Sequence, residues 1–197
     1  MQSSDTERLA PPEAEAFYRA VLRTLADADV PYLVGGAYAF VRYTGIDRRT
    51  KDFDIFVRPR DVQRILDVLT RAGFKTEVAF SHWLAKATLG DHFVDLIYGM
   101  GNGIAFIDDG WIRNSRASIL AACPVRIAPA EELMWHRLFI SERHRHDMSD
   151  IVHLMLTYGE SLDWARLLAR VGENWPLLLS QILMFSYVYP GYRSNVP

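Results

Sequence analysis

The chain has 197 residues, of which half are apolar and 23% are charged, as is usual for one globular domain or a core with a small appendage. Its net charge of -2 excludes a global cationic field, so no DNA partner is expected and RNA would need a local basic groove. The single cysteine excludes an internal disulfide framework. The polar N-terminus lacks a signal peptide's apolar stretch, and no segment is apolar enough to span a membrane, so we expect a cytoplasmic protein.

The first hundred residues predict alternating helices and strands. Apolar residues at helical spacing indicate helices, and short apolar runs bounded by glycine or proline indicate strands. The predicted elements are a helix over 12–29, a strand over 32–34, a helix over 37–43, a strand over 52–57, a helix that begins at an Asp61 N-cap and ends at Gly73, and strands over 83–88 and 92–98. Gly90 and Asp91 predict a turn between the last two strands.

The remainder of the chain is mainly helical by pattern. A glycine-rich loop over 99–103 and a short strand over 125–127 precede four predicted helices, over 131–142, 147–158, 162–171 and 175–187. This order predicts an α+β core over residues 1–100 and a mainly helical region over 101–197 that packs on it, joined between residues 99 and 128.

Aromatic residues are frequent in the last of these helical segments. We expect them to pack on buried helical faces, and the alternative is a stacking platform for a base or an aromatic acceptor. They are Trp164, Trp175, Phe185, Tyr187, Tyr189 and Tyr192.

Three carboxylates are the strongest functional signal. Asp52 and Asp54 are two apart in a predicted strand, so both side chains point to one face and repel each other unless a cation intervenes. Asp95 interrupts an apolar strand, where a charge is costly unless it is paired or bound to a metal. If the two strands are neighbours, three carboxylates converge, as two-metal phosphoryl or nucleotidyl transfer requires. An isolated Asp-x-Asp is common, however, and Asp95 alone would also suit an arginine partner.

A glycine pair supplies the phosphate side of this hypothesis. Gly35 and Gly36 follow a short apolar strand and open a predicted helix, 16 residues before Asp52. Backbone N–H groups in such a turn can bind phosphate oxygens, and glycine allows close approach. The alternative is an ordinary tight turn.

The glycine pair and the acids together resemble the DNA polymerase β-like nucleotidyltransferase superfamily, over about residues 30 to 157. The matching segments are Val34-Gly35-Gly36, then Thr50-Lys51-Asp52-Phe53-Asp54-Ile55, with Asp95 as the third acid. The resemblance implies a small mixed sheet flanked by helices, with a helical C-terminal region. The long gap between the glycines and the acids is more similar to stand-alone antibiotic nucleotidyltransferases and toxin-type members than to the minimal antitoxin type.

The downstream sequence extends the resemblance. Ala128-Pro129-Ala130-Glu131-Glu132-Leu133 followed by Arg137 is similar to a Pro-x-Glu-(Asp/Glu)-Leu helix with a basic residue. Arg145, Asp147 and Asp150 match the start of the next helix. The whole chain also resembles a group of uncharacterised bacterial nucleotidyltransferases.

The residues and the resemblance together give ten candidate site residues, of which Lys86 could equally be an ordinary exposed lysine. Asp52, Asp54 and Asp95 would hold Mg²⁺ or Mn²⁺, and Asp95 would also serve as the base. Gly35, Gly36 and nearby Thr50 or Lys51 would hold the triphosphate. Candidate contacts to substrate are Lys86, which shares a strand face with His82 and Leu84, and the basic residues Arg143 and Arg145.

The predicted activity is transfer of a nucleoside monophosphate from a nucleoside triphosphate to a hydroxyl acceptor, with release of pyrophosphate. The acceptor is unknown and is a small molecule, an RNA end or a protein. The first alternative is a toxin-type enzyme that modifies tRNA or protein, and the second is a non-catalytic nucleotide-binding module.

Overall fold

The computed structural model describes residues 12–46, 50, 52–141 and 146–197. Within them the chain forms two compact units, one of residues 12–39, 50 and 52–128, the other of Phe40–Ile46 and Pro129–Pro197. The helix α2 begins in the first unit and ends in the second. From the sequence we divided the chain into two regions near residue 100, and that domain boundary stays a prediction. No helix among the described residues has the length and apolarity needed to cross a bilayer.

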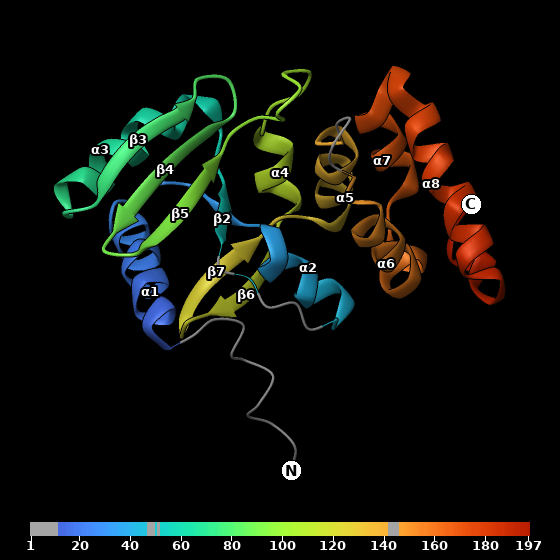
Figure 1. Cartoon of the computed structure of the whole chain (residues 1–197), viewed down its shortest axis with the longest axis horizontal. Helices are drawn as coiled ribbons and strands as arrows, with labels where there is room; N and C mark the ends of the chain where they lie inside the picture. Colours follow the sequence, from blue (N-terminus) through green and yellow to red (C-terminus); the bar gives the residue numbers. More distant parts are fainter. Residues whose placement is uncertain (1–11, 47–49, 51, 142–145) are drawn as a thin grey trace, which may run out of the picture. The chain divides into compact units, whose positions relative to one another are not determined.

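The first unit is a mixed sheet with helices (Figure 1). In its described residues seven strands pair in the order β3-β4-β5-β2-β1-β7-β6. The strands are β1 Leu33–Val34, β2 Phe53–Phe56, β3 Lys75–Phe80, β4 Leu84–Leu89, β5 His92–Ile97, β6 Arg116–Leu120 and β7 Cys123–Ile127. The helices are α1 Pro12–Asp27, α2 Gly36–Thr44, α3 Val62–Arg71 and α4 Asp109–Asn114. A mixed α+β sheet flanked by helices is therefore confirmed.

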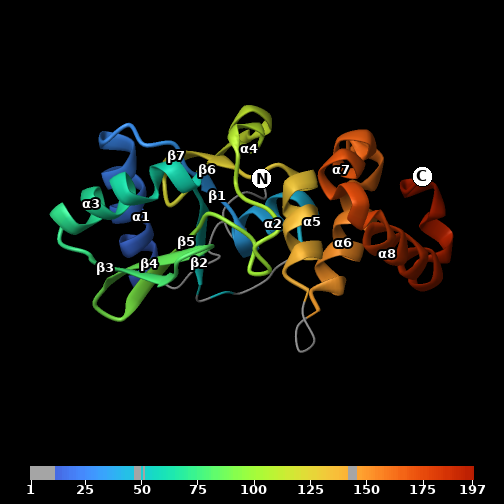
Figure 2. The same cartoon turned by 90° about the horizontal axis from the view of Figure 1, so that it is seen from above.

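Helices α1 and α3 lie against one face of β3, β4 and β5 (Figure 1 and Figure 2). Phe53 of β2 points to this side, where the ring of Tyr18 from α1 lies 4.3 Å from its own. Val94 and Leu96 of β5 alternate with Asp95 and are fully buried. Because strand side chains alternate, Asp54 and Asp95 point to the opposite face.

The sequence missed three elements of this unit: β3, α4 and β6. Strand β3 lies at a sheet edge and is largely exposed, so its residues lack the apolar alternation that marks a half-buried strand. Helix α4 has six residues, which is too short to show a helical period. Strand β6 is also an edge strand and is mostly exposed.

The predicted cap at Asp61 needs a correction. Asp61 does precede α3, but its side chain makes no capping hydrogen bond. Its Oδ2 instead accepts from Nε of Arg58 at 2.5 Å. Arg58, which follows β2, also pairs with Asp109 of α4 at 2.6 Å. Asp61 therefore helps to hold an arginine that connects the end of β2 to α4.

The second unit is helical. Besides the second half of α2, its described helices are α5 Ala130–Phe139, α6 Met148–Tyr158, α7 Trp164–Val171 and α8 Trp175–Val188. Short 3-10 turns connect α6 to α7 and α7 to α8, and another, Pro190–Asn195, follows α8. All four predicted helices are present. Arg137 of α5 pairs with Asp147 at 2.9 Å and with Asp150 at 3.3 Å, so this part of the downstream motif connects α5 to the start of α6.

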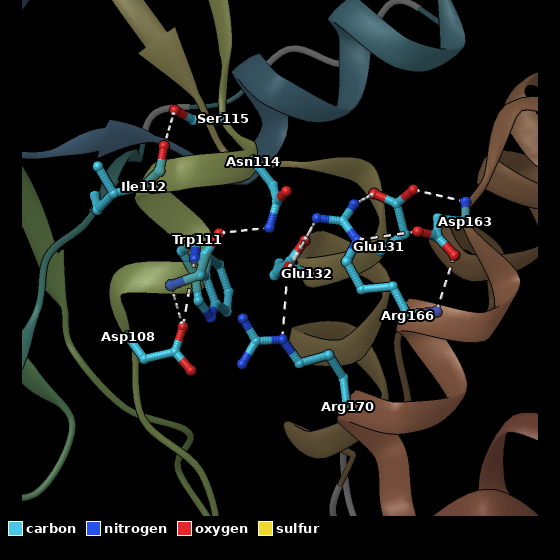
Figure 3. A network of polar contacts seen from close by, with 11 residues as sticks. Asp108, Trp111, Ile112, Asn114, Ser115, Glu131, Glu132, Asp163, Arg166 and Arg170 are labelled. Atoms are coloured by element: carbon cyan, nitrogen blue, oxygen red, sulfur yellow. Dashed lines mark hydrogen bonds and ion pairs between the residues drawn. The ribbon is translucent and has the colours of Figure 1, made fainter.

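A buried charge network joins α5 to α7 (Figure 3). Arg166 binds Glu131 and lies 3.4 Å from Glu132, and Arg170 lies 3.4 Å from Oε1 of Glu132. Glu131 also accepts from the backbone N–H of Asp163, at the start of α7, at 2.8 Å. Burial raises the pKa of Glu132, and the two arginines oppose that shift. The two arginines therefore partly compensate the cost of burying the Glu132 carboxylate.

Arg166→Met is expected to lower the free energy of unfolding near neutral pH by about 3 kcal/mol, because it leaves Glu131 and Glu132 buried with Arg170 as the remaining cation. Losing Arg166 raises the pKa of Glu132 further. Protonation then relieves the defect as pH falls, so the deficit should shrink by about pH 5. Urea unfolding at both pH values measures this, with Arg71→Met at an exposed position of α3 as control. An equal deficit at both pH values would contradict the ionic explanation.

Candidate active site

Four charged side chains form a row across four adjacent strands of the first unit. Asp54 of β2 is the register partner of Asp95 on the parallel strand β5. Asp95 is in turn opposite Lys86 on β4, and Lys86 is opposite Glu77 on β3. Paired residues point to the same face, so the row lies on the face turned away from α1 and α3. The hypothesis that the strands of Asp54 and Asp95 are neighbours is confirmed by the pairing of β2 with β5.

Asp95 and Lys86 form an ion pair in this row. Lys86 Nζ lies 2.8 Å from Asp95 Oδ1 and 4.5 Å from the centre of the Phe93 ring. Burial raises the pKa of Asp95, Lys86 opposes that shift, and the charge of Asp52 adds to it. The costly charge that the sequence indicated within this apolar strand is therefore compensated by a lysine.

The glycine pair lies directly against Asp54. The Gly35 N–H donates to the Asp54 carbonyl oxygen at 2.9 Å. Gly36 has a φ of +51°, and a Cβ atom there would lie 1.9 Å from Asp54 Oδ2 and 2.8 Å from its Cγ. A Cβ on Gly35 would lie 2.3 Å from the Phe56 ring. Both positions thus need glycine, because the turn packs on β2. The N-terminal end of α2, which begins at Gly36, contacts the Asp54 carboxylate.

Asp52 and Thr50 lie just before β2. The Asp52 N–H donates to Thr50 Oγ1 at 3.0 Å, and that hydroxyl donates back to the Asp52 carbonyl at 3.2 Å. Asp52 is exposed, while Asp54 is partly buried. The hydroxyl of Thr50 is therefore bound to the backbone of Asp52. Lys51, Arg143 and Arg145 lie outside the described residues.

The donor set suits a hard divalent cation, which prefers carboxylate oxygens. Asp54 and Asp95 are direct register neighbours, and Asp52 is close enough to influence the pKa of Asp95. In the part of the chain that the structure describes, no three His, Cys, Asp or Glu side chains form a ready ligand cluster. A cation would compete with Lys86 for Asp95.

Sequence reasoning missed two contributors to this site. Glu77 ends the charged row, but it lies on the strand that the pattern did not reveal. Tyr38 of α2 packs edge-on against both Tyr18 and Phe53, with ring centres 5.6 Å and 5.8 Å away. Tyr18 and Tyr38 therefore pack on β2 at the face opposite to Asp54. The sequence of α1 and α2 alone did not indicate this role.

Comparison with known proteins identifies the segment that carries these residues. The family model of aminoglycoside-2''-adenylyltransferase matches residues 18–99, which include the glycine pair and all three acids. No curated protein matches the sequence.

Solved structures supply the fold. The antibiotic-resistance factor ANT(2'')-Ia in solution is 14% identical with a TM-score of 0.54, over 90% of this chain and 93% of that one. Its crystal structure with adenylyl-2''-tobramycin is 14% identical with a TM-score of 0.53, over 89% and 98%. The lincosamide antibiotic adenylyltransferase LnuA, with lincomycin bound, is 18% identical with a TM-score of 0.49, over 72% and 95%. The likeness to ANT(2'')-Ia shows the fold.

Proposed function

We propose that the chain is a member of the DNA polymerase β-like nucleotidyltransferase superfamily and that it moves a nucleoside monophosphate from a nucleoside triphosphate to an acceptor hydroxyl. The observation that carries this proposal is the contact of Gly36 with Asp54, whose register partner is Asp95. A glycine turn at a helix N-terminus, a carboxylate pair and a sheet face turned away from α1 and α3 are thereby combined in one place, and such a turn can bind phosphate.

Different residues of the proposed site bind the triphosphate and the metal ion. The turn at Gly35 and Gly36 holds the triphosphate through backbone N–H groups, with Thr50 and Lys51 as further candidates. Asp52, Asp54 and Asp95 would hold Mg²⁺ or Mn²⁺, and the bound ion would neutralise the phosphates and stabilise the charge of the transition state.

In this proposal Asp95 accepts the proton of the acceptor hydroxyl. The acceptor oxygen bonds to the α-phosphorus, and the bond from that phosphorus to the oxygen that bridges to the β-phosphate breaks. Pyrophosphate leaves with that bonding pair. The hydroxyl proton passes to Asp95 Oδ2, the oxygen that Lys86 does not hold. Lys86 favours the ionised carboxylate and orients it before substrate binds.

We propose a small hydroxylated molecule as the acceptor. The family model that matches residues 18–99 is that of an adenylyltransferase acting on an aminoglycoside. ANT(2'')-Ia, which has the same fold, was crystallised with an adenylylated aminoglycoside. ATP is therefore the first donor to test, and amino sugars are the first acceptor class. An RNA end or a protein hydroxyl remains the alternative.

The experiment measures pyrophosphate release and label transfer from each of the four α-labelled nucleoside triphosphates. Acceptors are an aminoglycoside panel and the small-molecule, RNA and protein fractions of a cell extract, with Mg²⁺, Mn²⁺ or a chelator. Asp54→Asn should abolish transfer, while Asp91→Asn, an exposed aspartate in the β4–β5 turn, should not.

The distribution of label discriminates the alternatives. Label in small molecules supports the proposal, whereas label in RNA or protein indicates a toxin-type enzyme. Nucleotide binding by calorimetry without transfer to any fraction would contradict nucleotidyl transfer and would indicate a binding module.

A further inference from the structure

One oxygen of the Asp95 carboxylate has a partner that can be removed. Asp95 Oδ1 is buried, and among the described residues it has no hydrogen-bond partner apart from the Lys86 ammonium, whose Nζ lies 2.8 Å away. An ionised carboxylate is costly to bury without a compensating charge, so the charged form of Asp95 needs a cation beside it. In the metal-free protein that cation is Lys86.

Lys86 is held in a way that lets it leave Asp95. Its side chain is 30% exposed, and its further contact is with the face of the Phe93 ring, 4.5 Å from Nζ. A lysine ammonium is a strongly hydrated point charge on a flexible four-carbon stem, whereas an arginine would bind both carboxylate oxygens at once. Rotation of the side chain therefore moves the ammonium away from Asp95 without a shift of the strand β4.

A second carboxylate lies on the other side of Lys86. Glu77 on the edge strand β3 is the register partner of Lys86, so the Cβ atoms of the two residues are about 5 Å apart. Asp95 is the register partner of Lys86 on β5. Glu77 is exposed, whereas only 16% of the Asp95 side chain is exposed. Lys86 thus lies between a half-buried carboxylate that a metal ion would also bind and an exposed carboxylate at the edge of the sheet.

We propose that Lys86 is a positioning residue that occupies the cation position at Asp95 Oδ1 in the free protein, and that Glu77 receives its ammonium when a divalent cation binds. This inference rests on the metal site of the proposed function. An ammonium and a divalent cation repel each other, so both cannot lie against the same carboxylate oxygen.

The displacement of Lys86 has a consequence for the order of binding. Its free-energy cost lowers the affinity of the free protein for a divalent cation. A nucleotide supplies further oxygen ligands, so we expect the cation to load together with the triphosphate and not before it.

The test is Mn²⁺ binding to the full chain without nucleotide, from the electron paramagnetic resonance signal of free Mn²⁺ at about pH 8, where protons compete little for a carboxylate. Lys86→Met keeps the length of the side chain and removes the ammonium, so it should bind Mn²⁺ at least about 10-fold more tightly than the wild type. Lys86→Arg should keep the low affinity of the wild type, because the guanidinium still pairs with Asp95. Asp95→Asn in the Lys86→Met background should abolish the gain.

Lys75→Met is the matched control for net charge. Lys75 is exposed on β3 and lies two residues from Glu77, so it is on the same face of the sheet. Its loss removes an ammonium without touching the ion pair, and Mn²⁺ affinity should stay within about 2-fold of the wild type. Circular dichroism confirms that each variant is folded.

Glu77→Gln tests the alternative partner of the ammonium. In the wild type it should weaken Mn²⁺ binding about 3-fold, because the displaced Lys86 has lost the carboxylate that receives it. In the Lys86→Met background it should change nothing. A general effect of the Glu77 charge on the cation would instead have the same size in both backgrounds.

Three outcomes would overturn the proposal. Equal Mn²⁺ affinity of the wild type and Lys86→Met would remove the competition by Lys86 and leave nucleotidyl transfer untouched. An equal effect of Glu77→Gln in both backgrounds would remove Glu77 as the receiving carboxylate. Absence of Mn²⁺ binding in every variant would contradict the metal site itself, and with it the proposed function.

Discussion

Asp95→Asn is expected to lower kcat for nucleotidyl transfer by about 10³-fold while the protein stays folded. Asparagine keeps the size of the side chain but neither accepts the acceptor's proton nor supplies a charged ligand for a cation. Folding should survive, since burial raises the pKa of Asp95 and its charge is therefore costly in the native state. Lys86, which loses its ion pair, is partly exposed and can be solvated.

The measurement is single-turnover label transfer, combined with thermal unfolding of the same preparations. Asp91→Asn is the control, because Asp91 is an exposed aspartate in the turn that joins β4 to β5. Asp95→Asn should still bind nucleotide in the presence of a chelator, since the turn at Gly35 and Gly36 is unchanged. A variant that is active within about 10-fold of the wild type would remove Asp95 from the proton path and from the metal site.

The acid-bearing strands were predictable from local sequence. Asp54 and Asp95 each lie within an apolar run, and β2 and β5 formed where these runs predicted them. That the two strands are adjacent was a hypothesis, because parallel pairing depends on the chain between them and not on either run. The edge strand β3 was not predicted because none of its residues is buried, so its sequence lacks a buried apolar face.

The Lys86–Asp95 pair was within reach of the sequence. Gly90 and Asp91 form the turn between β4 and β5, and a hairpin pairs residues that are equally distant from its turn. Lys86 and Asp95 satisfy that condition. By contrast, the contact of Gly36 with Asp54 joins two segments through the tertiary fold, so a pattern could indicate a phosphate turn but not the carboxylate against it.

Gly36→Ala should be the most damaging single-methyl change in the first unit. The added Cβ would lie 1.9 Å from Asp54 Oδ2, 2.8 Å from its Cγ and 2.9 Å from its Cβ, so the whole Asp54 side chain must move. The φ of +51° adds a backbone cost of about 1 kcal/mol. Because the methyl group occupies the space between the turn and the carboxylate, kcat/KM for the nucleotide should fall at least about 100-fold.

Gly45→Ala separates the two effects. Gly45 follows the other end of α2 with a φ of +66°, and a Cβ there meets nothing within 4 Å. It should therefore lose a similar amount of stability from backbone strain, about 1 kcal/mol, and keep its activity. Chemical unfolding and nucleotide titration of both variants give the comparison. Equal activity in the two alanine variants would mean that the Gly36–Asp54 contact serves folding alone, and the phosphate site would then have to lie elsewhere on the sheet.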